Sequence, residues 1–237
     1  MKTVAVGIFC KTPLPGLSKT RLSPPLRPDE CADLSACFIR DLTATIQALT
    51  RDGDVTGYAV YTPVGTETAL RTLLPPGFRL LPQCEGDFGT RIITATRALL
   101  DAHAGAILVN SDSPTLPASI LRQAVDATRR GGSVALSPAH DGGYTLIGVS
   151  KLHQRLYADI PWSTAQVHGK TLERAAEIGL PVVDLPGWYD VDDGESLALL
   201  EAELAGAPTQ FAGGANAPAT RAYLNARNTP LRAGSLR

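Results

Sequence analysis

The sequence predicts an α/β fold in which one mostly parallel β-sheet lies between helices. Short apolar runs rich in β-forming residues alternate with segments whose apolar residues recur every three or four positions. The connections between these segments are short, as they are in βαβ units. The apolar runs 133–139 and 144–149 are separated by too few residues for a crossover helix. We therefore expect the sheet to become mixed at this point.

The individual elements follow from local patterns. The first strand is expected over 3–9, because the run TVAVGIF is apolar enough to be buried on both faces. A helix is expected over 28–49, where Pro28 suits a first turn and apolar residues repeat at helical spacing. Ser163 is expected to cap a later helix. The remaining strands are expected at 56–62, 78–82 and 106–110, and the remaining helices at 67–74, 89–102, 118–130, 163–179 and 195–204.

Length and composition indicate one large globular domain. The net charge of the 237 residues is −1, so nothing global favours a nucleic-acid or membrane-surface partner. The four cysteines lack paired spacing and no H-E-x-x-H motif occurs, so we expect a reduced, cytoplasmic protein without zinc, secretory signal or membrane span. We place the domain at 1–205 and a weakly ordered tail, with at most one short helix, at 206–237. The arginines in this tail are few and widely spaced, which disfavours a nucleic-acid-binding arm.

A cationic loop, KTPLPGLSKTRL, follows the first expected strand at 11–22. The residue directly before Lys19 is Ser18 and not a glycine, so the loop is not a Walker A motif, and no G-x-G-x-x-G fingerprint is present. Open α/β sheets bind ligands at the carboxyl ends of their strands, where this loop is expected to lie. Lys11, Lys19 and Arg21 suit phosphate oxygens, although three cations on a solvated surface loop would give the same pattern.

Acidic residues follow two other expected strand ends. Asp112 lies just past the end of the run AILVN, after Ser111, where it can be a Mg²⁺ ligand or can cap a turn before Pro114. In an extended segment Asp190 and Asp192 point to the same side and could coordinate one metal ion. Asp193 is better placed to cap the helix that follows. Clustered carboxylates repel one another, which favours a cation among them.

Two further segments combine glycines with functional side chains. Asp141 lies in a Gly-Gly turn between two expected strands, which is typical of a hairpin. Gly142 and Gly143 would also let the backbone approach a ligand closely, with Tyr144 at the rim. Arg91, expected on the first turn of a helix, is either an anion ligand or a surface ion-pair partner.

The segments KTPLPGLSKTRL, GDFGTR, NSDSPTLP, SPAHDGGYTLIGV, PWST and YDVDDGESL together resemble the rSAM/selenodomain-associated transferase 1 family. The resemblance is collinear over 3–204 and implies a GT-A-like (Rossmann-like) domain of the nucleotide-diphospho-sugar transferase superfamily. The cationic loop and the late Asp pair are also similar to phospholactate guanylyltransferases. Phospholactate itself is not carried over, because the segment containing Asp141 and Tyr144 differs from the acceptor segment of those enzymes.

The resemblance implies roles for individual residues. Lys19 and Arg21 would hold nucleotide phosphates, and Mg²⁺ (or Mn²⁺) would lie between nucleotide and acceptor. The implied metal ligands are Asp112, Asp190 and Asp192. The implied catalytic residues are Lys19, Arg21, Asp112 and Asp141. The implied nucleotide contacts are Lys11, Gly16, Lys19, Thr20, Arg21 and Arg91. The implied acceptor contacts are Asp141, Gly142, Gly143, Tyr144, Trp162 and Ser163.

Three functions are compatible with these residues. The first is nucleotidyl transfer from a nucleoside triphosphate to a small molecule bearing a phosphate or acid group, with release of pyrophosphate. The second is glycosyl transfer from a nucleoside-diphosphate sugar, in which Asp141 could be the general base. The third is a non-catalytic nucleotide-binding protein on the same fold. The expected partners are therefore a nucleotide or nucleotide sugar and a small acceptor.

Overall fold

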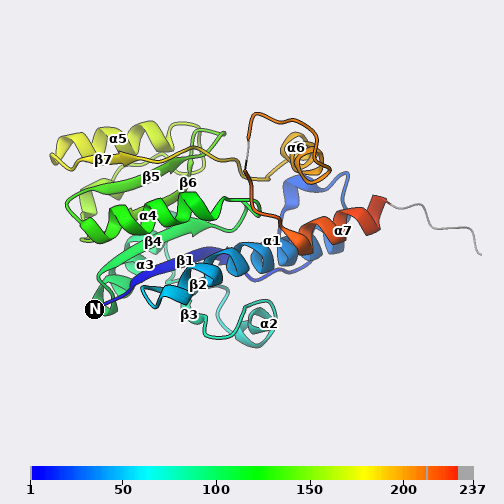
Figure 1. The fold of residues 1–237 in the computed structure, drawn as a ribbon, viewed down its shortest axis with the longest axis horizontal. Coiled ribbons are helices and arrows are strands. Elements are labelled where there is room, and N and C mark those ends of the chain that lie inside the picture. Colours follow the sequence, from blue (N-terminus) through cyan, green and yellow to red (C-terminus); the bar gives the residue numbers. More distant parts are fainter. Residues whose placement is uncertain (1, 212, 229–237) are drawn as a thin grey trace, which may run out of the picture.

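The computed structural model describes residues 2–211 and 213–228 (Figure 1). Within them the sheet has seven strands in the order β3-β2-β1-β4-β6-β5-β7. The strands are β1 (Val4–Lys11), β2 (Val55–Thr62), β3 (Arg79–Pro82), β4 (Gly105–Asn110), β5 (Val134–Pro138), β6 (Tyr144–Val149) and β7 (Val182–Asp184). The α-helices are α1 (Pro28–Leu49), α2 (Glu67–Arg71), α3 (Phe88–Ala102), α4 (Ala118–Arg130), α5 (Val167–Glu177), α6 (Gly194–Leu204) and α7 (Pro218–Asn228). Three short 3₁₀ helices are η1 (Thr20–Leu22), η2 (Thr50–Asp52) and η3 (Gln154–Tyr157).

The sheet is mixed, as predicted. Strand β1 lies at the centre and pairs in parallel with β2 and β4. Strand β6 runs antiparallel between β4 and β5, because the short connection from β5 can only close a hairpin. Strand β7 pairs in parallel with β5 and was not predicted. It is three residues long, too short for a periodic pattern to identify it.

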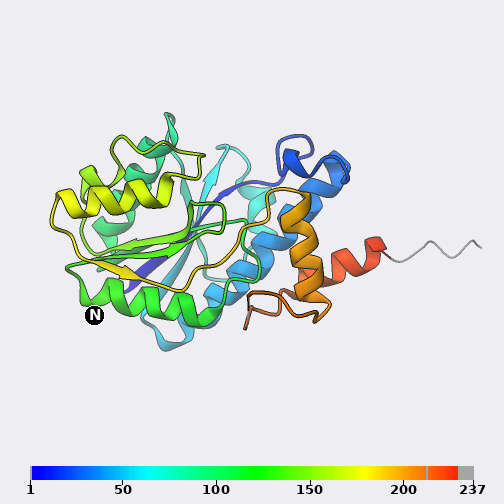
Figure 2. The same cartoon turned by 90° about the horizontal axis from the view of Figure 1, so that it is seen from above.

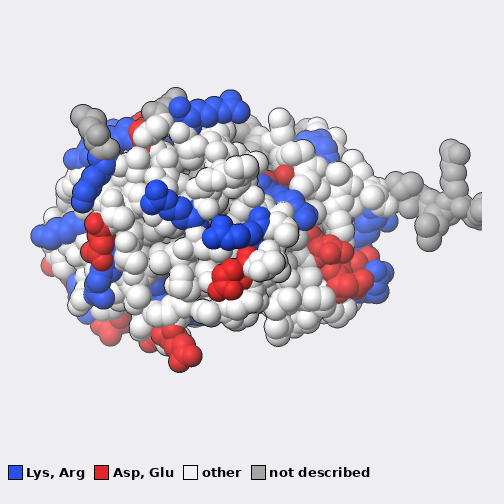
Figure 3. Space-filling model, turned by 90° about the horizontal axis from the view of Figure 1, so that it is seen from below, with Lys and Arg blue, Asp and Glu red and all other residues white. Residues whose placement is uncertain are grey.

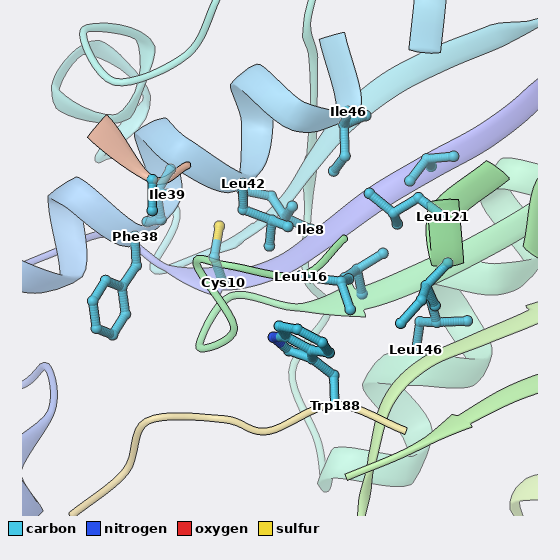
Figure 4. Packing of buried hydrophobic residues seen from close by; sticks show 14 of the residues in the cluster. Ile8, Cys10, Phe38, Ile39, Leu42, Ile46, Leu116, Leu121, Leu146 and Trp188 are labelled. Atoms are coloured by element: carbon cyan, nitrogen blue, oxygen red, sulfur yellow. The ribbon is translucent and has the colours of Figure 1, made fainter. Parts of the chain in front are cut away.

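Helices cover both faces of the sheet (Figure 2). One core cluster joins one face of β1 to α1 and α4, and a second joins the opposite face to α3 and α5. Alternation along β1 sends Val6 and Ile8 to the first cluster and Ala5 to the second. Figure 4 shows Ile8 of β1 and Leu42 of α1 pointing toward one another in the first cluster. The apolar run of β1 therefore fills both layers of the core.

Two predicted helices were too long. The helix expected over 67–74 ends at Arg71, before two consecutive prolines that disfavour helical backbone in the preceding residue. The helix expected over 163–179 begins at Val167, and Ser163 does not cap it but adopts a left-handed backbone with φ 64°. The segment before α5 instead packs on the hairpin turn, where a Cβ on Gly142 would lie 2.2 Å from the Ala165 carbonyl oxygen. Tertiary packing thus displaces the helix start.

The described part of the predicted tail packs against the rest of the domain. The Phe211 ring lies 5.3 Å from that of Trp188, centroid to centroid. The Ala215 N–H donates to the Thr115 carbonyl oxygen at 2.8 Å, and α7 then lies along α1 (Figure 1). Residues 229–237 of that tail lie outside the described residues, and the domain boundary stays a prediction.

Asp41 of α1 anchors α7. Its buried carboxylate accepts hydrogen bonds from the backbone N–H groups of Ala219 (2.9 Å) and Thr220 (2.7 Å) in the first turn of α7. We expect Asp41→Ala to lower the free energy of unfolding by about 1–2 kcal/mol, because these N–H groups lose their acceptor. Chemical denaturation measures this change. The control is Asp33→Ala on the exposed side of the same helix, and equal effects of the two variants would contradict the anchor.

The molecular surface carries charged side chains of both signs. Basic and acidic side chains both lie on the face shown in Figure 3, in keeping with a net charge of −1. The four cysteines are free thiols. No helix within residues 2–211 and 213–228 combines the length and apolar character needed to cross a membrane.

Candidate functional site

Two adjoining pockets lie at the carboxyl ends of the parallel strands, where open α/β sheets bind ligands. The first, here called the cationic pocket, has a volume of about 310 Å³. Its basic lining residues are Lys11, Lys19, Arg21 and Arg91. The second, here called the acidic pocket, has a volume of about 300 Å³. Its acidic lining residues are Asp112, Asp141, Asp190 and Asp192. Because both pockets are lined by Phe9, Phe88, Asp112 and Asp192, they meet at the same carboxylates.

Lys19 lies at the junction of the pockets. Its ammonium Nζ is 2.6 Å from Oδ1 of Asp112 and 3.0 Å from Oδ1 of Asp192, and it donates to the Val191 carbonyl oxygen at 2.6 Å. Burial alone would lower the pKa of Lys19, but the two carboxylates outweigh burial and raise it, so the side chain stays charged. The Lys19 backbone is left-handed, with φ 51°, which is uncommon outside glycine and recurs at functional sites.

A backbone hydrogen bond brings the late aspartates to the end of β4. The Val191 N–H donates to the Asp112 carbonyl oxygen at 2.9 Å, so Asp112 and Asp192 face the same lysine. Asp193 has the capping role predicted for it, since its Oδ1 accepts the Ser196 N–H at 2.9 Å at the start of α6. In the D-V-D-D segment, Asp190 and Asp192 therefore line the site, whereas Asp193 caps the helix.

The carboxylates of the acidic pocket are close enough to affect one another. Burial, followed by the charges of Asp141 and Asp192, raises the pKa of Asp190 to about 7. Of these neighbours, Asp192 is ion-paired with Lys19, which compensates one negative charge. The excess of negative charge on this side disfavours an anionic group in the ligand, and the carboxylate oxygens can accept hydrogen bonds from ligand hydroxyls.

Gln83, which we did not predict as a site residue, lines the cationic pocket and holds neighbouring groups in place. Its Nε2 donates to the carbonyl oxygens of Val60 (2.9 Å) and Cys10 (3.2 Å), which lie near the carboxyl ends of the neighbouring strands β2 and β1. Its Oε1 accepts from Nη1 of Arg91 at 3.1 Å and so fixes that guanidinium beside Phe88. The available signal was a polar residue directly after β3, the same signal that identified Asp112 after β4.

Replacing Gln83 by leucine is expected to weaken nucleotide binding. The variant leaves two backbone carbonyls without their donor and releases Arg91, so we expect KM for the nucleotide to rise about tenfold while kcat changes less. Steady-state kinetics at several nucleotide concentrations measure both values. Gln123→Leu, on the exposed side of α4, controls for the change in polarity. An unchanged KM would show that Arg91 needs no support from Gln83.

The middle of the chain matches a protein-family model. The model described as "Uncharacterized protein conserved in bacteria (DUF2064)" matches residues 45–164, half of the chain. The chain belongs to the DUF2064 family. The matched range contains Gln83, Arg91, Asp112 and Asp141, whereas the cationic loop and the late aspartates of this DUF2064 protein lie outside it.

Solved structures share the fold. The DUF2064 protein is 28% identical to a protein of Desulfovibrio desulfuricans G20 assigned as a nucleotide-diphospho-sugar transferase, with a TM-score of 0.82 and 96% of each chain covered. A cytidylyltransferase from Leptospira borgpetersenii serovar Hardjo-bovis (strain JB197) has a TM-score of 0.56 at 12% identity, with 98% of this chain and 99% of the other covered. CMP:2-keto-3-deoxy-manno-octonic acid synthetase complexed with CTP has a TM-score of 0.53 at 13% identity, covering 86% and 99%. The last two likenesses show the fold alone. A search of curated protein sequences found no match.

Most of the predicted site residues of the DUF2064 protein line one of the two pockets. The cationic pocket includes Thr20 with the four basic residues, and the acidic pocket includes Gly143, Tyr144, Trp162 and Ser163 with the four aspartates. Gly16 and Gly142 line neither pocket. Gly16 has φ 76° and serves the turn of its loop, and Gly142 packs on the Ala165 backbone. Asp141 lies in the predicted hairpin turn, where its Oδ1 accepts the Gly143 N–H at 2.8 Å, and it also lines the acidic pocket, while its functional role stays a prediction.

The carboxylates fit a magnesium ion that binds together with a nucleotide. No three His, Cys, Asp or Glu side chains among the described residues form a cluster that could hold a metal by themselves. Mg²⁺ prefers hard oxygen ligands and is usually held by one or two carboxylates plus substrate phosphates rather than by a protein cage. Asp112, Asp190 and Asp192 supply such oxygens beside the cationic pocket. The donor set therefore suits Mg²⁺ or Mn²⁺.

Proposed function

We propose that this protein is a Mg²⁺- or Mn²⁺-dependent transferase that moves a nucleotidyl group from a nucleoside triphosphate to a small acceptor. The observation that carries the proposal is the meeting of a cationic and an acidic pocket at Asp112 and Asp192. A triphosphate requires several cations, which only the first pocket offers among the described lining residues. The acceptor then occupies the second pocket, and transfer takes place where the two meet.

The cationic residues hold the leaving pyrophosphate. Lys11 is the last residue of β1, Arg21 lies in η1, and Arg91 reaches the same pocket from the first turn of α3. Lys19 lies at the junction and is assigned to the transferred phosphate. Because Arg21 is exposed and 3.8 Å from its nearest carboxylate, it is free to turn toward a ligand. Departing pyrophosphate carries more negative charge than a nucleoside diphosphate bound to a metal, which favours a triphosphate donor.

The reaction needs no protein nucleophile. An acceptor oxygen forms a bond to the α-phosphorus while the bond from that phosphorus to the bridging oxygen breaks, and pyrophosphate leaves with the electron pair. A bound Mg²⁺, held by one or two carboxylates of the set Asp112, Asp190 and Asp192 together with the phosphates, would neutralise charge on the phosphate oxygens. If the acceptor is a hydroxyl, its proton passes to Asp141. Catalysis would come mainly from positioning and from compensating charge.

Glycosyl transfer is the second candidate. It is favoured by the 28% identity to a protein assigned as a nucleotide-diphospho-sugar transferase. In this reaction the diphosphate of the donor would lie beside Asp112 and its sugar in the acidic pocket, with Asp141 as general base. The two candidates differ in the donor, a triphosphate in one and a nucleoside-diphosphate sugar in the other.

Calorimetric titration against nucleoside triphosphates and nucleotide sugars, with and without Mg²⁺, tests the donor. Tight Mg²⁺-dependent binding of one triphosphate, lost in Lys19→Ala and retained in Lys151→Ala on an exposed loop, would support nucleotidyl transfer. Preference for a nucleotide sugar would favour the second candidate instead. Binding of a nucleotide without pyrophosphate release for any acceptor would indicate a non-catalytic nucleotide-binding protein.

A further inference from the structure

The acidic pocket has an aromatic wall. Phe88 makes edge contacts with Phe9 and Trp162, at centroid distances of 5.4 and 5.1 Å, and Tyr144 lies 6.4 Å from Trp162. All four rings line the pocket. Phe88 remains 37% exposed and Trp162 is only half-buried, so ring surface is left for a ligand. Such a wall suits the flat apolar face of a ring better than an extended chain.

The rest of the lining is acidic. Asp112, Asp141, Asp190 and Asp192 contribute carboxylates, and no Lys, Arg or His occurs among the described residues that line this pocket. Lys19, from the neighbouring pocket, pairs with both Asp112 and Asp192 and compensates one of their two negative charges, whereas Asp141 has no ion pair within the described residues. A carboxylate without a counter-ion accepts hydrogen bonds from ligand hydroxyls and repels ligand anions.

We propose that the acceptor in the acidic pocket is an uncharged polyhydroxylated ring, a sugar or cyclic polyol, that stacks on Trp162 and Phe88 and donates hydroxyl hydrogen bonds to Asp141. This inference rests on the proposed function, because it names the acceptor class of the same transfer. It replaces the expectation of a phosphate- or acid-bearing acceptor, since the described lining offers such a group no cation. Asp141 is then the residue that rejects anionic acceptors.

The transfer to such an acceptor is balanced without further reactants. One acceptor hydroxyl oxygen bonds to the α-phosphorus, the bond to the bridging oxygen of the β-phosphate breaks, and the hydroxyl proton moves to Asp141. The products are a nucleoside monophosphate ester of the ring and pyrophosphate. A ring hydroxyl is a weaker nucleophile than a phosphate oxygen, so its attack is assisted by a nearby carboxylate base that accepts the hydroxyl proton.

Matched sets of probes test the charge preference directly. Binding to the whole protein would be measured by ligand-observed NMR without nucleotide. The first set of probes is glucose, glucose 6-phosphate, glucuronic acid and glucosamine. The corresponding galactose and mannose sets follow, together with myo-inositol and its monophosphate. The expected result is that at least one neutral member binds at least about tenfold more tightly than its anionic counterparts. Trp162→Ala should weaken that binding about tenfold, and Trp162→Phe should restore most of it.

Charge variants show whether the preference for neutral rings depends on Asp141 in particular or on the net charge of the protein. Asp141→Asn should reduce the preference against the phosphorylated member by at least about threefold, and Asp126→Asn on the exposed side of α4 should leave it unchanged. Equal or tighter binding of anionic members, tighter binding of glucosamine than glucose, or no binding of any member would overturn the inference.

Nucleotide binding is measured separately by the calorimetric titration. If neutral rings bind and no nucleotide does, the proposed function fails while the pocket assignment holds. If a nucleotide binds and anionic acceptors are preferred, only the present inference fails.

Discussion

Lys19→Ala is expected to lower kcat/KM for the nucleotide at least about a hundredfold and to destabilise the fold. The Lys19 side chain is 5% exposed, and its ammonium is the cation shared by Asp112 and Asp192. Its removal leaves two carboxylates facing each other beside Asp190. We expect the free energy of unfolding to fall by about 2 kcal/mol, less than for a fully buried pair because both carboxylates keep access to water.

Magnesium distinguishes this effect from simple loss of packing. A divalent cation can compensate the carboxylates that lose Lys19, so Mg²⁺ should raise Tm more in Lys19→Ala than in the unmodified protein. Thermal unfolding with and without Mg²⁺ measures the difference, and Lys151→Ala serves as the exposed control. Identical Mg²⁺ shifts in all three proteins, or unchanged kinetics in Lys19→Ala, would contradict the role given to Lys19.

Asp112→Asn is expected to abolish turnover with little loss of folding stability. The amide keeps the size of the side chain but loses the charge expected to hold Mg²⁺ beside the phosphates, which should lower kcat at least about a hundredfold. Stability should fall by no more than about 1 kcal/mol, because Lys19 keeps both Asp192 and the Val191 carbonyl oxygen.

Pyrophosphate release and chemical denaturation, measured on the same preparation of Asp112→Asn, test both parts of this expectation. Asp126→Asn is the matched control, since that carboxylate is exposed on α4 far from the site in the fold. Turnover equal to that of the unmodified protein would remove Asp112 from the metal assignment. A large loss of stability would instead show that its pair with Lys19 holds the loop in place.

Local patterns predicted the fold class and most of the secondary structure. The apolar run of β1 and the helical spacing of α1 are properties of consecutive residues, so they could be recognised without the rest of the chain. The errors lie where distant segments decide the local structure. Helix α5 starts late because residues near Ala165 pack on Gly142, and β7 exists only through its pairing with β5.

The residues of the candidate site also fall into those that local sequence could predict and those that it could not. Lys19, Arg21, Arg91 and Asp112 could be predicted because each is a charged residue near the end of an expected strand or the start of an expected helix. Gln83 was missed, because its importance lies in hydrogen bonds to the ends of two other strands. Local sequence patterns also could not predict that the site consists of a cationic and an acidic pocket.

The sequence by itself determined a mixed α/β sheet, a cationic loop after its first strand and carboxylates after later ones, because these follow from periodicity, turn residues and the order of elements. Only the tertiary structure decided that the Lys19 side chain is buried between Asp112 and Asp192, the latter 173 positions away in the chain. It also decided that aromatic rings from β1, α3 and β6 and from the segment before α5 form one wall. Such contacts depend on the packing of whole layers, which no short stretch of sequence encodes.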